Sequence, residues 1–194
     1  MSMVSQTLQG ATLSSISNVI AQGISAYKDN VPFSLHVAPI LKFAIFSIIS
    51  NPPNIIWQNF LEDLFPTNVA IARPPSEKAN GKPKSSASPR TRKSTQNILI
   101  KFMLDQTFGA VLNTLMFLAF IGYVNAPAGG KASAWDNVAL ETREKFWPMI
   151  YDGWKLWPAF SLISFLWIPV DKRIVAGCLV GMGWNIYLSL LVDA

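Results

Sequence analysis

The sequence is poor in the residue types that most often carry chemistry in proteins. Its 194 residues include one cysteine, Cys178, and one histidine, His36. A single cysteine excludes a disulfide within the chain, and neither residue has neighbours at a spacing typical of a metal site. No Ser-His-Asp, phosphate-loop or zinc-protease spacing is present. We therefore expect a protein that is not an enzyme and that needs no metal or cofactor.

Charged residues are also scarce. They make up 14% of the chain, whereas 51% is hydrophobic. This composition leaves too little polarity to cover the surface of a soluble domain, and 194 residues are the length of one domain. We expect a single all-α membrane domain over residues 1–194, in contact with the lipid bilayer.

Most of the positive charge is confined to one segment. Residues 73–93 contain seven basic residues against Glu77, so this segment contributes +6 and the rest of the chain −1 to the net charge of +5. A single basic segment on a neutral apolar chain favours a topology loop or a lipid-facing segment over nucleic-acid binding. Its Pro, Ser, Gly and Lys content predicts a flexible loop. A targeting element is the functional alternative.

The first apolar run, about Ala11 to Tyr27, is unusually polar for a helix exposed to lipid. Ser14, Asn18 and Gln22 recur at four-residue steps and so share one helix face. Small and polar residues on a span usually pack against other helices. Two roles fit this face: helix packing, or the lining of a water-filled pathway.

The second run, about Val37 to Phe65, contains Asn51-Pro52-Pro53-Asn54 near its middle. Two prolines remove backbone hydrogen bonds and clash with the preceding turn, so we expect a kink or a short break there. Non-helical backbone at membrane depth requires protein or water to satisfy it. Asn51 and Asn54 therefore mark either a polar cavity or a kink that serves packing alone.

The third run, Ile98 to Val124, carries charge inside an apolar stretch. Lys101 and Asp105 are four residues apart, which places both on one helix face where they can pair. An ionisable residue inside a span is a functional candidate by default. Asn113 adds polarity farther along, so Asp105 and Asn113 are candidate pore or packing residues.

The last third of the chain has a different pattern. Residues 135–151 mix apolar and charged side chains, which predicts an amphipathic helix at the membrane surface. Two further apolar runs, about 156–170 and 174–192, are separated only by Asp171, Lys172 and Arg173. This turn is very short for two full crossings, so we expect one of the two runs to be partial, tilted or re-entrant.

Anchoring residues are dense around the first of these two runs, where tryptophans, prolines and cations mark the edge of a bilayer. The pattern resembles the C-terminal motif of the family named for the 22-kilodalton peroxisomal membrane protein and the mitochondrial Mpv-seventeen protein. Weaker likeness extends over residues 17–22, 101–106 and 146–148. The residues that carry the motif are Trp154, Lys155, Trp157, Pro158, Phe160, Phe165, Pro169, Arg173, Trp184 and Asn185, the last two opening a Trp-Asn-x-Tyr-Leu-Ser ending.

The resemblance implies a bundle of about four transmembrane helices, here with an additional interfacial helix, and a non-selective channel for small hydrophilic metabolites. A structural or organising membrane protein is the rival class. Asn18 and the Phe146-Trp147-Pro148 motif look closer to the peroxisomal branch, which implies a multi-pass protein of the peroxisomal membrane; the mitochondrial inner membrane is the alternative. The partners implied are a peroxisomal membrane-protein import receptor and further copies of the chain, with no nucleic acid.

Overall fold

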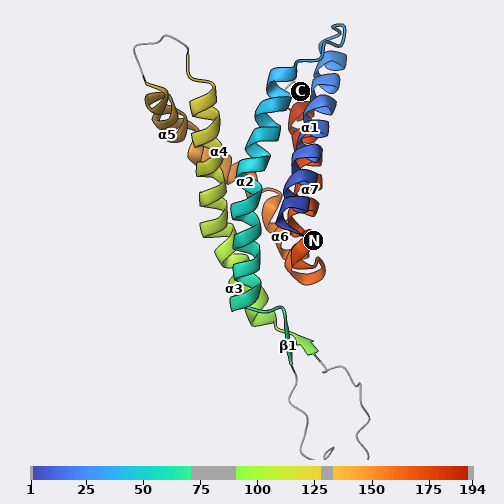
Figure 1. Ribbon diagram of the computed structural model, residues 1–194, viewed down its shortest axis with the longest axis vertical. Helices are drawn as coiled ribbons and strands as arrows, with labels where there is room; N and C mark the ends of the chain where they lie inside the picture. The colour runs from blue at the N-terminus through green and yellow to red at the C-terminus, as the bar shows by residue number, and fades with distance from the viewer. Residues whose placement is uncertain (1, 71–90, 128–132, 192–194) are drawn as a thin grey trace, which may run out of the picture.

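The structure is a computed structural model, and it describes residues 2–70, 91–127 and 133–191, with side chains described as far as Trp184. The chain is mostly helical (Figure 1). Its elements are α1 (Met3–Lys28), α2 (Val37–Leu64), β1 (Asn68–Ala70), β2 (Thr91–Lys93), α3 (Thr95–Leu104), a π-helical turn η2 (Asp105–Gly109), α4 (Ala110–Val124), α5 (Ala134–Gly153), α6 (Trp157–Trp167) and α7 (Val170–Leu191).

Two of these helical segments are long and apolar enough to cross a membrane. They are α2, with 28 residues, and the continuous 30-residue segment from α3 through η2 to α4, which we call the α3–α4 segment. At about 1.5 Å per residue, each exceeds the roughly 30 Å thickness of the hydrocarbon core. Among the described residues, α1 has 26 residues but is not apolar enough to count as such a segment.

Of the two outcomes expected for the second run, a kink or a short break, the break is absent, because α2 continues through Pro52 and Pro53. Prolines are tolerated inside membrane helices where neighbouring helices and polar side chains compensate for the lost backbone bonds. Here α1, α4 and α7 all pack against α2. Asn54 Nδ2 also donates to the Ser50 carbonyl oxygen at 3.0 Å, next to the carbonyl groups of Ile48 and Ile49, which have no backbone N–H partner at Pro52 and Pro53.

The helices form two arms that join at one end (Figure 1). One arm contains α1, α2 and α7, which pack along one another, and the other contains α4 and α5. The arms meet where α2 contacts the α3–α4 segment and where α6 packs against α3 and η2. The most buried apolar cluster lies at this junction and contains Leu61, Ile98 and Phe165. We call the end of the molecule where the arms join the strand end, because β1 and β2 lie beyond it. The opposite end is called the His36 end.

The strands depart from the all-α prediction. β1 pairs antiparallel with β2, with Val69 opposite Arg92. The last three residues of the basic segment therefore belong to a strand, while residues 73–90 of that segment lie outside the described residues.

The C-terminal helices agree with the sequence prediction in one important respect. α6 has only 11 residues, or about 16 Å of helix, so it is too short to cross a bilayer by itself. Residues 135–151 do form a helix, α5, which begins with a capping box between Ser133 and Asp136. Its exposed aromatic side chains include Trp135, Trp147 and Tyr151.

Candidate functional site

Polar side chains join α2 to the α3–α4 segment along most of the length of both. At the His36 end, Lys42 Nζ donates to Asn125 Oδ1 at 2.5 Å. Farther along, Asn54 and Asn113 exchange two amide hydrogen bonds of 3.0 and 3.2 Å. Both elements are otherwise strongly apolar, so this row of polar contacts sets the interface between them apart from their other faces.

Asp105 continues this row at the π-helical turn. Its Oδ1 accepts from Gln58 Nε2 at 3.0 Å and from Trp57 Nε1 at 3.3 Å, and both donors belong to α2. Its Oδ2 accepts from Ser161 Oγ of α6 at 2.6 Å and from Gln106 Nε2 at 3.3 Å. π-Turns within helices frequently mark functional sites, and here the turn places a carboxylate among four donors from three elements.

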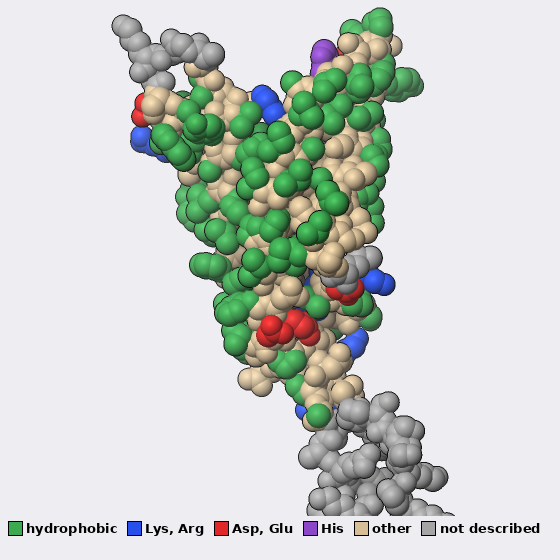
Figure 2. All heavy atoms as spheres, in the orientation of Figure 1, with side chains coloured by type: hydrophobic (Ala, Val, Ile, Leu, Met, Phe, Trp, Pro, Cys, Tyr) green, Lys and Arg blue, Asp and Glu red, His purple; other side chains and the backbone are tan. Residues whose placement is uncertain are grey.

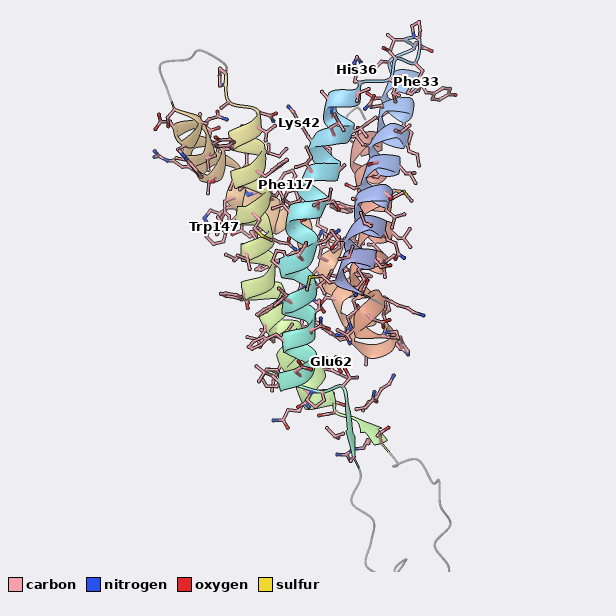
Figure 3. All side chains as sticks on the ribbon, in the orientation of Figure 1. Phe33, His36, Lys42, Glu62, Phe117 and Trp147 are labelled. Atoms are coloured by element: carbon pink, nitrogen blue, oxygen red, sulfur yellow. The ribbon has the colours of Figure 1, made fainter. Side chains whose placement is uncertain are left out.

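The pair predicted between Lys101 and Asp105 is wrong. Lys101 is fully buried, and its Nζ instead lies 2.7 Å from Glu62 Oε2 and 2.5 Å from Thr67 Oγ1. Arg173 Nη2 reaches the same Glu62 oxygen at 2.8 Å. Lys101 and Arg173 also lie 5.2 and 4.9 Å from the ring centre of Phe165. Glu62 therefore receives two cations, from α3 and α7, at the strand end (Figure 3).

Together these contacts form what we call the polar seam: Lys42–Asn125, Asn54–Asn113, Gln58–Asp105 and Glu62–Lys101. Lys42, Gln58 and Glu62 were not among the sequence candidates. A four-residue spacing on α2 could have revealed them, because side chains at this spacing share a helix face. The residues at that spacing are Lys42, Phe46, Ser50, Asn54, Gln58 and Glu62.

The polar candidates on α1 lie elsewhere. Ser14 Oγ donates to the Phe43 carbonyl oxygen at 3.3 Å. Gln22 holds both backbone groups of His36: its Nε2 donates to the carbonyl oxygen at 2.9 Å, and its Oε1 accepts from the amide at 2.8 Å. Asn18 Oδ1 accepts a second bond from Gln22 Nε2 at 2.8 Å. These residues tie α1 to the start of α2 and do not reach the polar seam.

Asn51 is separate from both groups. It is buried, and its Nδ2 donates to Ser47 Oγ at 3.0 Å. Gly10 of α1 lies so close that an added Cβ would collide with the Asn51 amide and would lie 3.2 Å from Cys178 Sγ of α7. Asn51 thus marks the point where α1, α2 and α7 approach most tightly.

The motif residues near the C-terminus hold α6 and α7 together. Trp157 and Phe160 of α6 lie over Gly181 and Gly177 of α7, where an added Cβ would be 3.6 Å from each ring. Arg173 links α7 to Glu62. The remaining motif residues are Trp154 at the end of α5, Lys155 paired with Asp152 at 2.6 Å, Pro158 in the first turn of α6, Pro169 before α7, Trp184 within α7, and Asn185, whose side chain lies outside the described part.

Large apolar side chains cover the outside of this arrangement (Figure 2). On α2 alone, Ile45, Ile49, Ile56 and Phe60 are each about half exposed. Soluble monomers rarely expose apolar patches of this extent. Two membrane-length apolar helices with a polar contact between them and apolar side chains outside define an α-helical integral membrane protein.

Comparison with known proteins shows what the chain is similar to. Residues 130–189 match the model of the Mpv17 / PMP22 family. The chain is 24% identical over 202 residues to Protein sym1 of Schizosaccharomyces pombe, covering 97% of this chain and 84% of that protein. It is 28% identical over 191 residues to PXMP2/4 family protein 3 of Dictyostelium discoideum, covering 96% of this chain and 82% of that protein. No solved structure matches the chain.

Residues 130–189 are thus similar to the Mpv17/PMP22 family, whose proteins are multi-pass proteins of organelle membranes. The matched segment spans α5, α6 and α7 and contains the motif residues from Trp154 onwards. The relatives do not separate the peroxisomal branch from the mitochondrial branch.

Proposed function

We propose that the protein is a non-enzymatic, non-selective channel that lets small hydrophilic metabolites cross an organelle membrane. The observation that carries this proposal is the polar seam. Its contacts join the two segments that are long and apolar enough to cross a bilayer, and they recur from Lys42 at the His36 end to Glu62 at the strand end.

Membrane physics supports a functional role for the seam. Tight helix packing in a membrane is achieved with small residues, as at Gly10 and at Gly122, where an added Cβ would lie 2.8 Å from the Val138 backbone of α5. Ionisable groups inside a span are costly and are functional candidates by default. Asp105, for which the described residues provide hydrogen-bond donors but no ion pair, is the strongest such group.

Planar-bilayer recording of the purified, reconstituted protein tests the proposal. We expect unitary conductance, with a change in ion selectivity when Asp105→Asn replaces the carboxylate of the π-helical turn by an uncharged amide. Asn18→Ala is the matched control, since it removes a polar group from α1 outside the seam and should leave selectivity unchanged. Conductance with the same selectivity in all three proteins would remove Asp105 from the path.

The rival proposal is an organising membrane protein in which these groups serve only to pack helices. One observation favours it: the seam residues have hydrogen-bond partners on neighbouring helices. A silent bilayer, with inserted protein whose helical circular dichroism is intact, would support this rival over the channel.

For the compartment, we propose the peroxisomal membrane, with the mitochondrial inner membrane as the alternative. The basic segment 73–93 would then bind a membrane-protein import receptor. Fluorescence microscopy of the full chain against markers of both organelles tests the compartment. Replacing the lysines and arginines of residues 73–90 by alanine should disperse a peroxisomal signal; an undisturbed signal would refute the targeting role.

We further propose self-association of the chain, which light scattering in detergent would measure.

A further inference from the structure

The stripe of α2 residues at four-residue spacing has one aromatic member. From Lys42 to Glu62 the other members are polar or charged, and Phe46 alone is apolar. It lies one turn from Lys42, the residue that bonds Asn125 across the seam. A lone ring therefore interrupts a polar stripe on a membrane-length helix.

Phe46 closes the contact between α2 and α4 with two rings from the opposite helix. Its ring centre lies 5.2 Å from that of Phe117, with the planes nearly perpendicular at 80°. It lies 5.4 Å from that of Phe120. These three rings lie between the Lys42–Asn125 bond on one side and the Asn54–Asn113 pair on the other.

The molecular surface is hollowed at the end of the molecule where Lys42 bonds Asn125. Figure 2 shows a hollow at the His36 end, between the arm of α4 and α5 and the arm of α1 and α2. Lys42 and Phe117 project into the space between α2 and α4 at this end (Figure 3). A solute that enters from the His36 end therefore meets Lys42 first, then the rings, and then the amides of Asn54 and Asn113.

We propose that Phe46, together with Phe117 and Phe120, is the constriction that sets the size limit for solutes in the polar seam. This inference rests on the proposed channel function. Apolar constrictions in pores limit passage by their width and by expelling water. A single substitution, Phe46→Ala, removes the ring from the α2 side of the path. The size limit of the channel should therefore change with this one residue.

The test is efflux of uncharged solutes of graded size from proteoliposomes that contain the full chain. Wild-type protein should release the smallest solute, glycerol, and retain a disaccharide. Phe46→Ala should release the disaccharide at least about tenfold faster than wild type, because the narrowest apolar point has been widened. The matched control is Phe60→Ala, since Phe60 lies on the same helix but is 50% exposed and stacks on Trp57.

The possible outcomes distinguish failure of the proposed constriction from failure of the proposed channel function. Glycerol release with an unchanged size limit in Phe46→Ala would overturn the constriction and leave the channel standing. An equal gain in Phe60→Ala would also overturn it. No release from any variant, with protein folded and inserted, would overturn the channel itself. If Phe46→Ala does not fold, Phe117→Ala removes the opposing ring from α4, and the same shift in size limit is expected.

Discussion

Glu62 is predicted to be the residue whose neutralisation destabilises the strand end most. It receives two buried cations, Lys101 and Arg173, whose side chains are 0% and 5% exposed. Glu62→Gln keeps the size of the side chain but leaves both cations without an anion. Replacing either cation by methionine instead leaves Glu62 paired with the other cation.

The magnitudes follow from this asymmetry. Breaking a buried ion pair by removing one partner costs about 3–5 kcal/mol, because the remaining charge stays buried. We expect Glu62→Gln to fall in this range. Lys101→Met and Arg173→Met should each cost about 1.5–3 kcal/mol, the value of one charge-assisted hydrogen bond. The double variant Glu62→Gln with Arg173→Met should cost less than the sum of its two single changes, because removal of Arg173 relieves part of the unpaired charge.

The assay is unfolding in mixed micelles with increasing sodium dodecyl sulfate, followed by far-ultraviolet circular dichroism. Asp152→Asn provides the control, since it breaks the exposed ion pair with Lys155, and exposed pairs contribute about 0–1 kcal/mol. A loss of stability in Glu62→Gln no larger than in Lys101→Met would refute the reasoning, because it would mean that the two cations do not depend on one carboxylate.

Three further predictions concern contacts between helices. Gly10→Ala should destabilise the protein by about 1–3 kcal/mol, because the added Cβ would overpack against the Asn51 side-chain amide of α2. Gly183→Ala should be neutral in the same unfolding assay, since nothing lies within 4 Å of its added Cβ. Equal effects of the two substitutions would contradict tight packing of α1 against α2 at Gly10. In a double-mutant cycle with leucine at Asn54 and Asn113, we expect a coupling free energy of about 0.5–1.5 kcal/mol, and additive effects would mean that the amide pair does not form in the membrane. Gln22→Leu should increase hydrogen exchange at the backbone amide of residue 36, because its acceptor is lost, and unchanged exchange would exclude this contact.

Several elements could be read from the sequence because the signals that specify them are local. The spans of α2 and of the α3–α4 segment follow from apolar runs longer than the hydrocarbon core is thick. The helix at residues 134–153 follows from its amphipathic pattern and the Ser133–Asp136 cap. The short length of α6 follows from the close spacing of its flanking prolines and charges, which leave 11 helical residues.

Two departures from the sequence prediction have a common physical cause. Pro52 and Pro53 lack backbone donors, and this local penalty predicted a kink or a short break, but α2, against which three helices pack, has no break. Lys101 and Asp105 share a helix face, and this local geometry predicted a pair. Lys101 instead bonds Glu62, which is 39 residues away in sequence. In both cases contacts between distant segments outweighed a preference that is local.

The sequence by itself determined that this chain is an apolar helical protein, roughly where its two membrane-length helical segments lie, and which motif it shares with the Mpv17/PMP22 family. Only the tertiary structure decided which polar groups meet. It separated Gln22 and Asn51, which tie helices together, from Asn54 and Asp105, which lie in the polar seam, and it placed Phe46 among them. The reason is that helix periodicity fixes which residues share a face, whereas the partner of that face depends on how the helices pack in three dimensions.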